Sequence, residues 1–141
     1  MDPLSITAGI AGLASLAIQV VPALHDYVAT AKGAERDIGW YADEVDALVE
    51  VCLSLVDFLK ADAVSQKSRF RTTDSVLGRT VSACEVSLHE LGILLQSPAG
   101  WTQKMKWPLR KKKVEEIIQR IGRYTNMFQF ALTVEGSMLS P

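Results

Sequence analysis

The residues of this chain that could do chemistry are two histidines, two cysteines and a few adjacent carboxylates. Neither His25 nor His89 has a second metal-type ligand three or four residues further along the chain, as a zinc site on a helix needs. Glu115–Glu116 and Asp43–Glu44 are adjacent pairs, so on a helix they point in different directions and cannot face one another as acid and base. No nucleophile motif, phosphate-binding loop or dinucleotide fingerprint occurs. The sequence therefore predicts a non-enzymatic protein with no catalytic residue, no metal and no cofactor.

One cluster of basic residues could bind an anionic ligand. Cations at the start of a helix oppose its dipole by a few tenths of a kcal/mol each, and such a departure from local preference can mark function. Two interpretations compete: contact with anionic lipid, worth about 1 kcal/mol per charge near the surface, or a solvated turn that pairs with an acidic helix. Nucleic acid is not favoured, because aromatic residues do not interleave with a long basic face. The basic cluster consists of Lys104, Lys106, Arg110, Lys111, Lys112 and Lys113.

Composition indicates one intracellular globular domain. The 141 residues are 48% hydrophobic and 22% charged, with a net charge of -1, which fits a single domain with its own core. Residues 35–62 hold eight acidic and two basic side chains, whereas residues 67–113 hold ten basic and three acidic ones. We expect these blocks to complement one another on neighbouring helices. Cys52 and Cys84 lie among apolar residues without motif spacing, which predicts buried, reduced thiols and a cytosolic protein.

The segment from Pro3 to Leu24 carries no charge. As a helix it would span roughly 33 Å, about the thickness of a bilayer's hydrocarbon core. A signal peptide is disfavoured because the preceding residues include Asp2 and no basic residue. A permanent transmembrane helix is disfavoured by the interspersed small and polar residues and by the absence of a flanking basic cluster. The favoured interpretation is a helix buried in a bundle, with a capacity to leave it.

This first helix has two predicted faces. Asp2 can cap it, Pro3 suits its first position, and Pro22 should kink it near one end. A narrow stripe of small and polar residues would let another backbone approach closely; it comprises Ser5, Ala8, Gly12, Ser15 and Gln19. The broad opposite face is apolar and comprises Ile6, Ile10, Leu13, Leu16, Ala17, Val20, Val21 and Leu24.

Three more helices follow from apolar positions at three- and four-residue spacing. They are expected over residues 34–62, from the capping residues 72–74 to about 95, and from near Pro108 to about Val134. No strand alternation or internal repeat is visible. The predicted fold is all-α, an antiparallel bundle of about four helices with a hydrophobic N-terminal helix.

Two stretches resemble a known family. The opening, Met1 to Leu13, resembles the start of many fungal STAND proteins, which are NLR-like receptors. Lys106-Trp107-Pro108-Leu109 through Lys113, followed by Glu115, Ile121 and Tyr124, resembles a second hallmark of the same N-terminal domain. Together they are similar to the fungal HeLo-like domain, from Met1 to about Leu132. The resemblance implies a single domain over residues 1–141, excised from or N-terminal in a larger protein, and related to the four-helix executioner domain of the mixed-lineage kinase-like pseudokinase.

The resemblance also implies a function. Such domains assemble on activation and their first helix attacks the plasma membrane, inducing cell death. The implied partners are other copies of the chain, anionic membrane lipids and an upstream NLR or amyloid-signalling protein. The domain would be cytoplasmic and move to the plasma membrane on activation. A non-lytic adaptor that self-associates or docks other helical domains is the alternative.

Carried onto this sequence, the resemblance makes residues 4–21 the inserting segment. The expected close-packing residues are Ala8, Gly9, Gly12 and Ser15, and the six basic residues would contact anionic lipid. The inserting side chains would be those of Leu4, Ile6, Ile10, Leu13, Leu16, Val20 and Val21.

Overall fold

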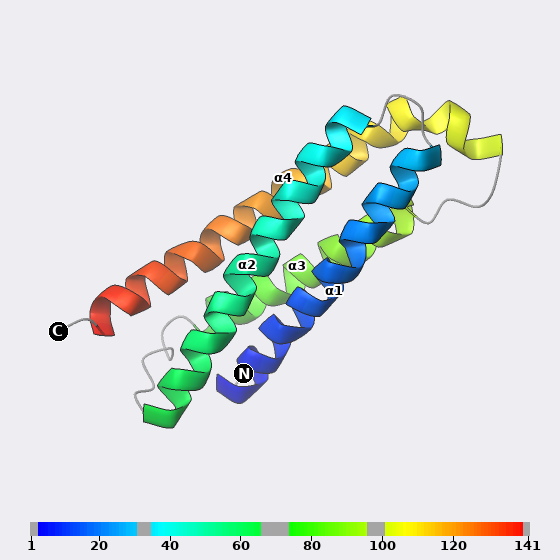
Figure 1. Ribbon diagram of the computed structural model, residues 1–141. Helices are drawn as coiled ribbons and strands as arrows, with labels where there is room; N and C mark the ends of the chain where they lie inside the picture. Colours follow the sequence, from blue (N-terminus) through cyan, green and yellow to red (C-terminus); the bar gives the residue numbers. More distant parts are fainter. Residues whose placement is uncertain (1–2, 31–34, 66–73, 96–100, 140–141) are drawn as a thin grey trace.

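Four helices and no strand make up the described part of the chain, in a computed structural model that describes residues 3–30, 35–65, 74–95 and 101–139 (Figure 1). The predicted all-α fold with a hydrophobic first helix is therefore confirmed. The helices are α1 (Pro3–Thr30), α2 (Glu35–Ser65), α3 (Asp74–Leu95) and α4 (Trp101–Leu139).

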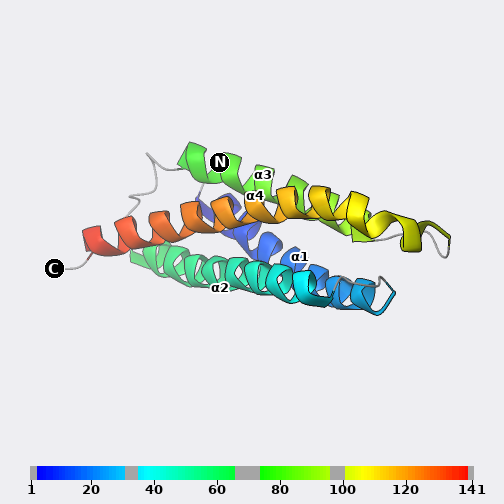
Figure 2. The same ribbon diagram turned by 90° about the horizontal axis from the view of Figure 1, so that it is seen from above.

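The helices run alternately up and down, but they do not all pack in chain order. α1 packs against α2 and α3, and α4 packs against the same two helices. α2 and α3 therefore occupy opposite corners of the bundle, as do α1 and α4; Figure 2 shows α1 and α4 between α2 and α3. Successive helices pack together in the pairs α1–α2 and α3–α4, whereas α2–α3 is not among the main interfaces. The contacts α1–α3 and α2–α4 join helices that run in the same direction (Figure 1).

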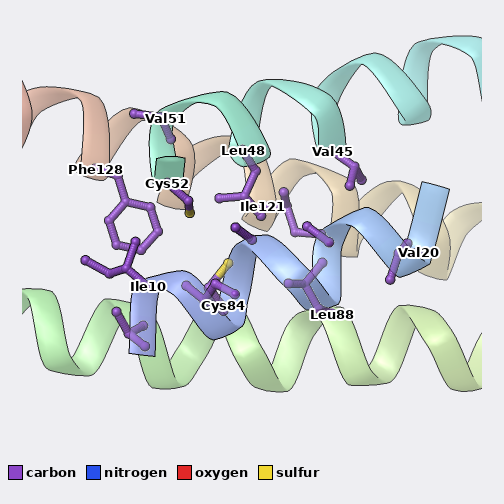
Figure 3. Close-up of a cluster of buried hydrophobic side chains, with 14 of the residues drawn as sticks. Ile10, Val20, Val45, Leu48, Val51, Cys52, Cys84, Leu88, Ile121 and Phe128 are labelled. Atoms are coloured by element: carbon purple, nitrogen blue, oxygen red, sulfur yellow. The ribbon is translucent and has the colours of Figure 1, made fainter. Parts of the chain in front are cut away.

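One continuous core fills the centre of the bundle. Each helix contributes apolar side chains at three- and four-residue spacing, so one stripe of each faces inward. Tyr41 of α2 and Phe128 of α4 are the largest fully buried side chains, and Figure 3 shows Phe128 beside Ile10 of α1. Fully burying one large aliphatic or aromatic side chain contributes about 1.5–3 kcal/mol. The core thus depends on all four helices.

Two prolines lie inside helices. α4 begins at Trp101 and runs for 39 residues, so its expected start near Pro108 is wrong; proline is common at a first helical position but here follows two turns of helix. Figure 1 shows the first part of α4 at an angle to the rest, as expected where proline removes a backbone hydrogen bond. α1 likewise continues through Pro22 to Thr30. Pro22 is exposed, so water can bind the carbonyl that its missing N–H leaves without a partner.

Candidate functional site

The candidate site is α1, whose inner face supplies part of the core. Seven of its side chains are buried, at most 4% exposed, and this set includes four of the predicted inserting residues. Leu16 and Val21 are partly buried against the same cluster. The side chain of Leu4 lies outside the described residues. The inner face is Ile6, Ile10, Leu13, Ala14, Ala17, Val20 and Leu24.

The outer face of α1 is exposed and carries no charge. We define it as Ala8, Gly12, Ser15, Ile18 and Gln19. Ile18, the one large aliphatic side chain among these five residues, is 52% exposed.

Four small residues were expected to let α1 pack closely against another helix, and one of them does so within the bundle. A Cβ added at Gly9 would lie 3.2 Å from Cγ1 of Val81, so α1 and α3 approach closely there. A Cβ added at Gly12 would meet nothing within 4 Å. Gly12, Ala8 and Ser15 are all exposed to solvent. Inside the bundle these three residues are therefore exposed rather than buried between helices.

α1 contains a stretch long and apolar enough to cross a membrane. The stretch is Ile6–Asp26, of 21 residues, and 33% of its apolar window is buried inside the bundle. Length and composition of this kind are shared with core helices of soluble proteins, which are mostly buried. The low buried fraction reflects the exposure of the outer face.

Three residues of the basic cluster fall in the described part of α4. Lys112 and Lys113 are exposed, and Lys111 is partly exposed with an interaction of its own. Lys113 borders a hollow of about 370 Å³ between α3 and α4, where Nη2 of Arg120 lies 3.1 Å from Oε2 of Glu90. The side chains of Lys104, Lys106 and Arg110 lie outside the described residues.

A second surface was not predicted from the sequence. The α3/α4 groove has a volume of about 480 Å³ and an almost entirely apolar lining. The hydroxyl of Thr80 donates to the backbone oxygen of Val76 at 2.8 Å, so this polar group already has an internal partner. The groove is lined by Val76, Leu77 and Thr80 of α3 and by Asn126, Met127, Phe130, Ala131 and Val134 of α4.

A pattern in the sequence could have revealed this groove. Met127, Phe130 and Val134 recur at three- and four-residue spacing, one position away from the core stripe through Phe128 and Ala131. When an apolar stripe is wider than the core requires, the residues at its edge are expected to be exposed.

The residues considered for chemistry do not form a reactive centre among those described. Burial raises the pKa of the Cys52 thiol to about 12, and burial together with the neighbouring Cys52 raises that of Cys84 to about 12. Thiols held protonated in this way are poor nucleophiles and poor metal ligands. Within the described ranges, no group of three or more His, Cys, Asp or Glu side chains lies together as a metal site.

The fold and the candidate site define an α-helical bundle domain whose first helix has a buried apolar face and an uncharged exposed face. Residues 1–129 match the N-terminal domain family described as pigment biosynthesis cluster protein PigL N-terminal, a fungal family. Because the match covers most of the chain, the chain belongs to this family. No curated protein and no solved structure matches it.

Proposed function

We propose that this chain is a membrane-targeting, cell-death-inducing effector domain in which oligomerisation leads α1 to leave the bundle and enter a bilayer. The observation that supports this most is the missing charge on the outer face of α1. Surface helices of soluble bundles carry charged residues on their outward side, and α2 follows this rule with the exposed Asp43, Asp46 and Asp57. α1 has no charged residue on any side from Pro3 to Leu24.

The energetics favour release of α1 into lipid and not into water. Exposing the five large side chains of its inner face to water would cost on the order of 10 kcal/mol. In a bilayer the same side chains are again removed from water, and the outer face adds no charged group to bury. A helix of 21 residues spans about 31 Å, which matches the hydrocarbon thickness.

The basic cluster supplies the attraction to the membrane in this proposal. The start of α4 and the end of α1 lie at the same end of the bundle (Figure 1). Lys112 and Lys113, bound to anionic headgroups, would hold the C-terminal end of α1 at the membrane surface. The exposed Asp26 at that end would stay among the headgroups. The domain would rest in the cytoplasm and move to the plasma membrane when an upstream NLR or amyloid-signalling partner brings copies together.

Leakage of vesicles that contain anionic lipid tests this function. A charged residue at the centre of a membrane helix costs about 2.5–3.5 kcal/mol. Ile18→Asp places one near the middle of the apolar stretch while leaving the core untouched, so we expect a folded protein that no longer causes leakage. Val86→Asp is the matched control, because Val86 is 56% exposed on α3, and it should leak like the wild type.

Two outcomes would count against this function: intact vesicles at the highest soluble protein concentration, or equal leakage by the Ile18→Asp and wild-type proteins. A charge at Leu13 would not serve as a test, because Leu13 is 2% exposed and the substitution would disrupt the core.

A non-lytic docking domain is the second candidate. The observation that favours it is the α3/α4 groove, an apolar surface away from α1. This function predicts a stable complex with a helical partner, or a stable oligomer, without any effect of lipid. Complex formation by a protein that never leaks vesicles would support it.

A further inference from the structure

The α3/α4 groove concentrates exposed apolar side chains on one surface. Phe130 is 71% exposed, Met127 44% and Val76 43%, and the lining contains no charged residue. Single apolar residues on a protein surface are normal, but several gathered around one groove mark an interaction site.

The exposed side chain at the edge of the groove favours a helix as its occupant. A small-molecule site would bury most of its ligand within an enclosed pocket. Here Phe130 stands out from α4 at the groove's edge, so it offers a protruding side chain that needs a recess on a partner. Helices provide such recesses where small residues are spaced three and four apart.

The outer face of α1 offers the matching surface on another copy of the chain. It is uncharged like the groove, whereas the outward sides of α2 and of the first half of α4 carry charged residues. Gly12 is exposed between Ala8 and Ser15, and a Cβ added there would meet nothing within 4 Å, so a side chain of another molecule can approach the backbone closely at this point. The lengths also agree: residues 8–18 of α1 extend about 15 Å and residues 126–134 of α4 about 12 Å.

We propose that the α3/α4 groove of one molecule binds the outer face of α1 of a second copy. This inference rests on the proposed function, since it names the surfaces through which the domain would first assemble, while α1 is still in the bundle. α1 contributes nothing to the lining of the groove, so each molecule presents two different surfaces. Contacts between different surfaces are heterologous and build rings or open chains larger than dimers.

Sedimentation of the purified chain in lipid-free buffer tests the proposal. The wild type should form species larger than dimers as its concentration rises. Phe130→Asp removes the exposed aromatic side chain and Gly12→Asp places a charged side chain on the outer face of α1; each should weaken self-association by about 30-fold or more and give monomers. An equimolar mixture of the two variants retains one intact pair of surfaces, so it should form dimers and nothing larger.

Controls separate loss of the interface from loss of the fold. Circular dichroism and thermal unfolding should match the wild type for both variants, since both sites are exposed. Val86→Asp, outside the groove, should assemble as the wild type does. Phe130→Ala offers a milder second variant at the same site and should also weaken association.

Four results would overturn the proposal: a wild type that stays monomeric at every concentration, a Phe130→Asp variant that assembles normally, a mixture that stays monomeric, or a groove that binds detergent or fatty acid without any protein assembly. Because no lipid is present, the outcome is independent of leakage. Leakage by a protein that never assembles through these surfaces would overturn this inference and leave the proposed function standing. Normal assembly without leakage would support this inference and count against the proposed function.

Discussion

The buried hydroxyl of Tyr41 on α2 donates a hydrogen bond to Oε1 of Glu115 on α4, across 3.1 Å. Tyr41 itself is fully buried, whereas Glu115 is partly exposed. The bond therefore ties the acidic helix α2 to α4 at the edge of the core. It joins two helices that run in the same direction (Figure 1).

Tyr41→Phe should lower the free energy of unfolding by about 1–2 kcal/mol, because it removes a hydrogen bond to a carboxylate and leaves the ring in place. Urea-induced unfolding measures the loss. Glu115→Gln is the control and should cost less, since its amide oxygen still accepts the bond. An unchanged urea midpoint for Tyr41→Phe would contradict this role.

Gly9 and Gly12 should respond in opposite ways to added side chains. Gly12→Ala should stabilise the fold by about 0.5–1 kcal/mol, because alanine has the higher helix propensity and the added Cβ meets nothing. Gly9→Leu should destabilise it by about 1–3 kcal/mol, because the side chain would be forced against Val81. Thermal unfolding of both variants checks the contrast. Equal effects at the two sites would mean that α1 and α3 do not approach closely at Gly9.

The buried thiols should make stability fall at high pH. Burial raises the pKa of Cys52 and Cys84 from 9.0 to about 12, so the unfolded chain loses these protons first. Their contribution to stability is complete below pH 9.0 and is lost progressively between 9.0 and about 12. Urea unfolding across this range should show a steeper loss for the wild type than for a Cys52→Ala/Cys84→Ala double variant. Parallel curves would contradict the assignment.

Binding to anionic vesicles should depend on where the positive charges lie. Replacing Lys111, Lys112 and Lys113 by glutamine should weaken binding by up to about 3 kcal/mol and reduce its sensitivity to salt. Vesicle co-sedimentation at two salt concentrations measures both effects.

A charge-matched variant provides the control for that experiment. Lys60, Arg79 and Arg123 are exposed on other parts of the surface, and their replacement by glutamine removes the same total charge. If both triple variants bind equally, the basic cluster has no special part in lipid contact.

The fold could be predicted from the sequence wherever a long apolar periodicity was uninterrupted. Ile10, Leu48, Leu88 and Ile121 all belong to stripes recognised from their spacing, and all are fully buried. Helix ends near prolines were harder to predict, because proline is compatible both with the start of a helix and with a bent interior. Pro108 lies in the bent interior of a helix, and the sequence around it does not distinguish this case from the start of a helix.

Placement of the helices and of the groove could not be predicted in the same way. The order of helices around the bundle depends on which stripes fit together in three dimensions, and spacing along one helix does not contain that information. Val76 is an apolar residue of α3 but is 43% exposed, because it lies at the edge of the stripe and lines the groove together with Phe130. The exposure of a residue at the edge of an apolar stripe depends on how closely the neighbouring helix approaches.

The corner position of α1 has a mechanical consequence. The four main helix interfaces form a closed circuit, α1–α2–α4–α3, and detaching α1 breaks two of them and spares the two made by α4. The remainder would open into a trough with α4 as its floor and α2 and α3 as its walls. Because α2 and α3 would each still pack against α4, removal of α1 would not by itself require the other three helices to unfold.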